Sequence, residues 1–176
     1  MKLMVTKFVH ERGSFLRDVV FAASDGLVTT FAVVAGSQGA AFAPKIVVIM
    51  GFANLLADGV SMSSGTYLGI KSEVDYEKAE GGTSDSEVSP IKHALVTFAA
   101  FDLAGLVPLL PYVTGMENQF YVSVVFVILV LFLIGTLRGK FTKKHWYVSS
   151  LEMLLVGGLA AVVAYLTGDL IETFTR

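Results

Sequence analysis

Long apolar runs, interrupted by a few polar side chains, dominate the hydropathy pattern of this chain. At about 1.5 Å of rise per residue, a helical run of roughly 20 residues crosses the hydrocarbon core of a bilayer. Five runs reach or approach that length: residues 16–38, 44–70, 91–114, 120–137 and 146–167. We therefore predict an all-α integral membrane protein with five transmembrane helices, forming a single transmembrane domain over residues 1–176.

The second run carries a regular polar stripe inside otherwise apolar sequence. Every fourth residue from position 54 to 66 belongs to this stripe, namely Asn54, Asp58, Met62 and Thr66. Residues four apart lie on one face of a helix. An Asp near the bilayer centre costs about 2.5–3.5 kcal/mol on insertion scales, so we expect Asp58 to face protein or water and not lipid.

Counting residues from the predicted membrane faces brings further groups to the depth of this stripe. Taking residues 16, 70 and 91 as the starts, Asp25 lies about 13 Å deep, Met62 about 12 Å, Asp58 about 18 Å and Asp102 about 16 Å. Three carboxylates and one thioether are thus expected near the midplane, where transporters commonly bind ions.

Each of these residues could also have a structural role that involves no metal ion. Asp25 and Asp58 each precede a glycine, and Asp-Gly pairs often end or break helices. Met62 could simply fill packing space, and Asp102 could hold two helices together through hydrogen bonds. Glu152 could pair with a cytoplasmic lysine. The three histidines show no metal-ligand spacing and are expected at the surface, at positions His10, His93 and His145.

The connection between the second and third runs, residues 71–90, is acidic. We expect a short cytoplasmic linker here, too short for a folded domain. Three of its acids would share one face if the second helix continued into the cytosol, and could then collect divalent cations: Glu73, Glu77 and Glu80. The alternative is a solvated acidic loop without a ligand.

Composition narrows the class of protein. The hydrophobic fraction is 54%, mean hydropathy is +0.69 and net charge is −2, which does not favour a nucleic-acid partner. The absence of cysteine excludes disulfides and thiolate ligands. Most Lys and Arg residues fall on one side of the predicted spans, so the positive-inside rule places the amino terminus in the cytoplasm and the carboxyl terminus outside.

Carboxylates together with a thioether suit a divalent first-row transition metal, so iron(II) or manganese(II) is a better substrate than calcium. An empty carboxylate site buried in the membrane tends to hold protons, and a bound metal ion expels them. The same residues could therefore exchange metal for protons. No bound cofactor is expected, and no nucleophile–base pair indicates an enzyme.

Two segments resemble a known family. The sequences FAASDGLVTTFAVVAG at residues 21–36 and LADGVSMSSGTY at residues 56–67 are similar to the first and second helices of the vacuolar iron transporter family. The resemblance implies a homodimer with an ion path at the subunit interface, proton-coupled export of iron(II), and metal binding by Asp25 and Met62. Many members carry a glutamate where this chain has Thr66. Many also have a cytoplasmic metal-binding domain where this chain has only the acidic linker, so this chain resembles a short form of the family.

Two other functions fit the same residues. A passive divalent-cation channel would use the same acidic path without proton coupling, and a non-transporting scaffold or accessory protein would use the Asp residues only to hold helices together. The expected location is the plasma membrane if the chain is prokaryotic and a vacuolar-type membrane if it is eukaryotic.

Overall fold

The computed structural model describes residues 2–81 and 89–175, with side chains from residue 13 onward. This described part of the chain consists of helices, turns and short connections, and no strand occurs in it. The helices are α1 (Lys2–Gly39), α2 (Pro44–Ala79), α3 (Pro90–Gly105), the 3-10 turn η1 (Val107–Leu109), α4 (Leu110–Val113), α5 (Gln119–Phe141) and α6 (Trp146–Thr175).

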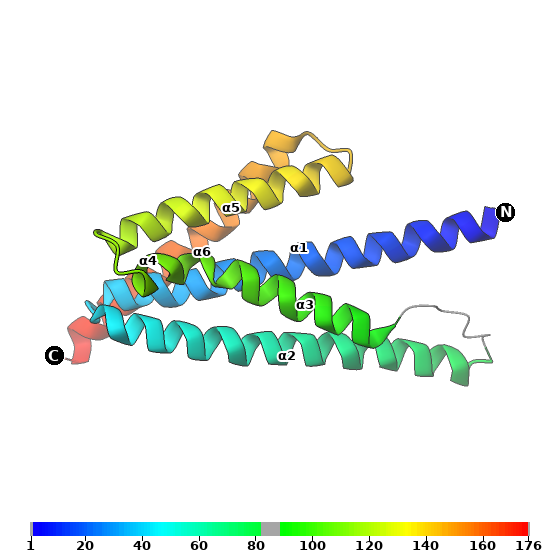
Figure 1. Ribbon diagram of the computed structural model, residues 1–176, viewed down its shortest axis with the longest axis horizontal. Coiled ribbons are helices and arrows are strands. Elements are labelled where there is room, and N and C mark those ends of the chain that lie inside the picture. Colours follow the sequence, from blue (N-terminus) through cyan, green and yellow to red (C-terminus); the bar gives the residue numbers. More distant parts are fainter. Residues whose placement is uncertain (1, 82–88, 176) are drawn as a thin grey trace.

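Five segments are long and apolar enough to cross a membrane, which confirms the predicted helix count. They are α1 from Gly13, α2, α5, α6 and the segment Pro90–Val113, which joins α3, η1 and α4. Figure 1 shows that the start of α1, the end of α2 and the start of α3 lie at one end of the bundle. The carboxyl terminus lies at the other end, as an odd number of spans requires.

The second helix is longer than its apolar run. It continues to Ala79, so the prediction that a linker begins at residue 71 is wrong for residues 71–79. No glycine or proline interrupts this acidic stretch before Gly81, whose φ of 77° is a left-handed conformation that ends helices easily. The rest of the predicted linker includes residues 82–88, which lie outside the described part.

Prolines interrupt the regular helix of the third span. α3 stops at Gly105, and the chain continues through a 3-10 turn that contains Pro108 before α4 begins. Proline lacks the N–H that a helix interior needs, so regular α-helix cannot run through this point.

Small residues set the packing of the last two helices. At Gly135 of α5, an added Cβ would lie 2.5 Å from the Cα of Ser150 on α6, and at Gly139 it would lie 2.9 Å from the Cα of Trp146. These distances show that α5 and α6 lie in close contact at the two glycines. Of the apolar stretch of α6 only 6% is buried, against 22% for α5, so α6 and not α5 is the more exposed helix in this single chain.

Candidate functional site

Three helices meet tightly where the intramembrane carboxylates lie. An added Cβ at Gly59 of α2 would lie 3.0 Å from Cγ of Asp102 on α3. At Gly26 of α1 it would lie 2.9 Å from the carbonyl carbon of Phe101, and at Gly105 of α3 it would lie 2.9 Å from the carbonyl oxygen of Gly26. Both distances are too short for a real side chain against backbone atoms, so glycine is required for α1 and α3 to approach this closely.

The junction gathers one carboxylate from each helix. Asp25 on α1 lies within electrostatic range of Asp58 on α2. Asp102 on α3 packs against Gly59, the residue after Asp58. Both oxygens of Asp102 are buried and have no hydrogen-bond partner among the described residues. The hydrogen-bonding role considered for Asp102 is therefore not seen here, and its carboxylate is free to accept a cation or a proton.

The helices are continuous through both Asp-Gly pairs. α1 runs without a break past Asp25 and α2 past Asp58, so the alternative of a helix break at either pair is not seen. Each glycine serves close helix packing instead of a turn.

The carboxylates of the junction do not form a closed metal cage. Among the described side chains, no group of three or more His, Cys, Asp or Glu residues is close enough to hold a metal ion. The three carboxylates alone therefore do not provide a coordination shell for a metal ion.

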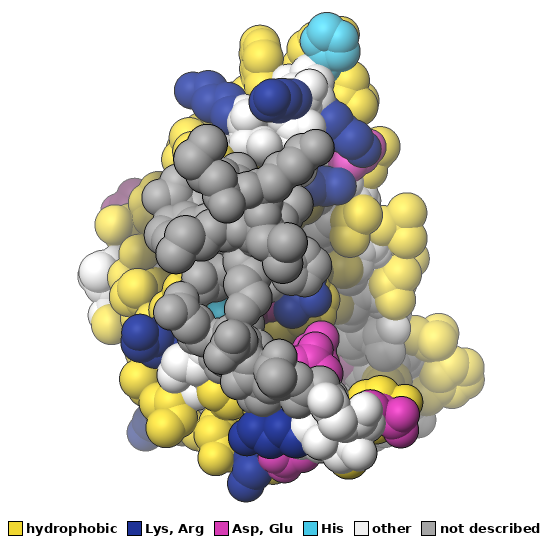
Figure 2. Space-filling model, turned by 90° about the vertical axis from the view of Figure 1, so that its right-hand side faces the viewer, with side chains coloured by type: hydrophobic (Ala, Val, Ile, Leu, Met, Phe, Trp, Pro, Cys, Tyr) yellow, Lys and Arg dark blue, Asp and Glu magenta, His cyan; other side chains and the backbone are white. Residues whose placement is uncertain are grey.

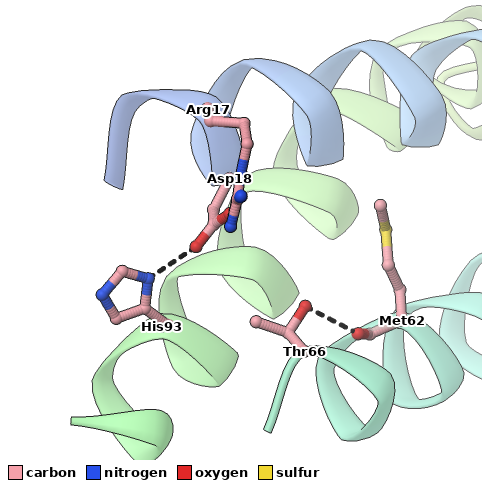
Figure 3. A network of polar contacts seen from close by, with 5 residues as sticks. All are labelled: Arg17, Asp18, Met62, Thr66 and His93. Atoms are coloured by element: carbon pink, nitrogen blue, oxygen red, sulfur yellow. Dashed lines mark hydrogen bonds and ion pairs between the residues drawn. The ribbon is translucent and has the colours of Figure 1, made fainter. Parts of the chain in front are cut away.

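The other members of the polar stripe are partly buried. Met62 packs against the apolar core, and its carbonyl accepts a hydrogen bond of 3.0 Å from the hydroxyl of Thr66 (Figure 3). The thioether of Met62 takes no part in that bond. The amide nitrogen of Asn54 is buried without a partner among the residues described.

The acidic face of α2 lies far from the carboxylates of the junction. Glu73, Glu77 and the helix-capping Glu80 are all exposed. Fifteen residues of helix separate Glu73 from Asp58, which is about 22 Å along the axis. The continued helix meets the condition under which the three glutamates were expected to share one face.

One buried polar pair was missed from the sequence. His93 is 1% exposed and its Nδ1 lies 2.5 Å from Oδ2 of Asp18 on α1, so the prediction that His93 is a surface residue is wrong. The spacing of residues along α3 could have predicted that His93 is buried. The buried residues of this helix lie four apart, namely His93, Thr97, Phe101 and Gly105.

The remaining predicted polar residues lie at the surface. His145 is exposed, and the side chain of His10 lies outside the described part. Glu152 is exposed and forms an ion pair with Arg138 at 3.1 Å, so its partner is an arginine and not a lysine.

Five helices long and apolar enough to cross a bilayer, three of which carry a partly buried aspartate, define a multi-pass membrane protein. A model of the VIT family matches residues 16–88 and 78–169. The chain therefore belongs to the VIT family.

Several relatives carry the name of a transporter. The chain is 28% identical to the vacuolar iron transporter of Toxoplasma gondii, over 90% of this chain and 74% of that protein. It is 26% identical to vacuolar iron transporter 1 of Oryza sativa, over 92% and 87% respectively. It is 33% identical to vacuolar iron transporter homolog 3 of Arabidopsis thaliana, over 88% and 82%.

Proposed function

We propose that this protein exports iron(II) or manganese(II) from the cytosol in exchange for protons. The single observation that carries the proposal is the junction of α1, α2 and α3. It brings Asp25 into electrostatic range of Asp58 and places Asp102 against Gly59. Membership of a family whose named relatives include iron transporters supports iron as the substrate.

The uncompensated charge of the carboxylates is the physical basis of the proposed transport. Several carboxylates packed within an apolar bundle are unfavourable unless protons or a cation neutralise them. A divalent ion that binds them displaces protons, and protons that return release the ion. In this proposal the protonated and metal-bound forms alternate, which couples the two flows.

Met62 is proposed to select the metal. It lies one helical turn from Asp58, on the same stripe of α2. A thioether is a soft donor, so it favours iron(II) over magnesium and calcium. Because the junction does not enclose a metal ion by itself, we propose that a homodimer with an ion path at the subunit interface supplies further ligands.

The orientation is proposed from charge. Figure 2 looks onto the end of the bundle where α1 starts, and Lys and Arg side chains gather around that end together with several acids. Cytoplasmic segments carry the excess of Lys and Arg, which supports an amino terminus inside and a carboxyl terminus outside. The exposed glutamates of α2 would then face the cytosol and collect cations for export.

The test is metal uptake into proteoliposomes with and without a pH gradient, for iron(II), manganese(II), zinc(II) and calcium(II). The proposal predicts iron(II) or manganese(II) uptake that rises several-fold when protons can flow in the opposite direction. Uptake that ignores the pH gradient would favour a passive channel. If folded protein takes up no metal, transport is excluded and the non-transporting scaffold remains as the function.

A further inference from the structure

The seam between α1 and α3 holds a second ionisable site, separate from the three carboxylates of the junction. Asp18 and His93 meet there, seven residues before Asp25 and nine before Asp102 in the sequence. At 1.5 Å per residue, Asp18 is about 10 Å along α1 from Asp25. The pair is therefore not a direct neighbour of the proposed metal ligands.

The burial of this pair is unusual for ionisable side chains. The side chain of His93 is 1% exposed and that of Asp18 is 9% exposed. The ring of Phe15 covers the imidazole at 4.4 Å between centroids. Figure 3 shows the pair at the contact of the two helices. Imidazole is the side chain whose unperturbed charge changes near neutral pH.

The second nitrogen of His93 has no partner. Nε2 is buried and makes no hydrogen bond within the described part of the chain, and neither does the hydroxyl of Thr97 one turn further along α3. Buried polar atoms are nearly always satisfied in folded proteins, and exceptions often mark functional groups. The two unpartnered atoms lie on the buried line of α3 that leads toward Phe101, the neighbour of Asp102.

Charged groups lie close to His93 on both helices. The carboxylate of Asp18 contacts Nδ1 of His93 and also binds the guanidinium of Arg17 at 3.0 Å. His93 lies in the first turn of α3, and its neighbour Lys92 is exposed.

We propose that His93, paired with Asp18, is the group that carries the exchanged proton across this part of the α1–α3 seam. Nε2 takes up one proton to give an imidazolium held by the Asp18 carboxylate, and it returns to the neutral ring when that proton leaves. The inference rests on the proposed metal–proton exchange and adds a second protonation site, about 10 Å along α1 from Asp25, to the carboxylates of the junction.

The first experiment measures protonation and not transport. Protein with nitrogen-15 histidine is placed in lipid nanodiscs without metal, and ring signals are followed by NMR from pH 5 to pH 8. His10→Gln and His145→Gln identify the other two signals, so His93 is found by elimination. The proposal predicts that the His93 ring changes protonation state in this range. A ring that keeps one state throughout overturns it.

The second experiment measures metal uptake and proton counterflow together in proteoliposomes. Glutamine can still donate a hydrogen bond to Asp18 but does not titrate, so His93→Gln should keep the helix contact yet lose at least tenfold in proton counterflow per metal ion. His145→Gln, at an exposed position, is the matched control and should resemble wild type.

The outcomes separate the two proposals. Folded His93→Gln protein with the wild-type ratio of protons to metal overturns the role of His93 and leaves the exchange intact. Wild-type protein that moves metal without protons overturns the exchange itself, and this role with it.

Discussion

Gly59 of α2 lies directly against the carboxylate of Asp102 on α3, so that an added Cβ would stand 3.0 Å from Cγ of Asp102. A side chain at position 59 must therefore displace the carboxylate or separate the helices. We expect Gly59→Ala to lower the free energy of unfolding by about 1–3 kcal/mol, as overpacking does. We also expect at least a tenfold loss of metal uptake, because Asp102 moves.

Gly65→Ala is the matched control for this change. Gly65 lies on the same helix, and an added Cβ there meets nothing within 4 Å. Thermal unfolding and proteoliposome uptake should both match or exceed wild type, since alanine favours helix over glycine. Equal behaviour of the two alanine variants would show that the contact between Gly59 and Asp102 has no effect on either property.

Met62→Leu tests metal selection. Leucine keeps about the same volume, so the change should cost under about 1.5 kcal/mol of stability while removing the sulfur. We expect the preference for iron(II) over calcium(II) in competition uptake to fall about tenfold. Met153→Leu, at another partly buried position packed on the core, is the control and should keep the preference. An unchanged preference in Met62→Leu would contradict coordination by the thioether.

The exposed glutamates of α2 should increase metal uptake when the metal concentration is low. In the double variant Glu73→Gln with Glu77→Gln, we expect the metal concentration for half-maximal uptake to rise several-fold with an unchanged maximal rate. Asp75→Asn is the control, because at 100° per residue Asp75 points about 200° away from Glu73. A loss of maximal rate in the glutamate variant would point to a structural role for these side chains.

The contact of α6 with α1 depends on glycine. An added Cβ at Gly168 would collide with the carbonyl group of Gly36, coming within 2.9 Å of its carbon. We expect Gly168→Ala to lower the free energy of unfolding by about 1–3 kcal/mol in thermal unfolding. Gly158→Ala on the same helix meets nothing within 4 Å and should be neutral. Equal stability of the two variants would mean that α6 shifts on α1 at little cost.

The five spans could be predicted from the sequence because a bilayer requires long apolar helices, whatever their packing. The 3-10 turn at Pro108 has a local cause, because proline lacks the N–H that a regular helix needs. The end of α2 could not be placed from hydropathy, because residues 71–79 are polar yet contain no helix-breaking residue before Gly81.

The candidate site was predictable in part. Charged residues inside apolar runs identified Asp25, Asp58 and Asp102, since such residues are expensive in a membrane and face protein. The pairing of His93 with Asp18 joins residues 75 positions apart in the sequence and depends on how α1 and α3 cross. A hydropathy pattern carries no information about how two helices cross. A histidine near a predicted membrane–water interface is more often exposed than buried.

The most direct test of the account replaces each intramembrane carboxylate in turn. Metal binding and uptake are measured for Asp25→Asn, Asp58→Asn and Asp102→Asn, with Asp169→Asn at an exposed position of α6 as the control. The account predicts at least a tenfold loss of iron(II) uptake in each folded variant of the junction and less than a twofold change in the control. Folded junction variants that transport iron(II) at the wild-type rate would contradict it.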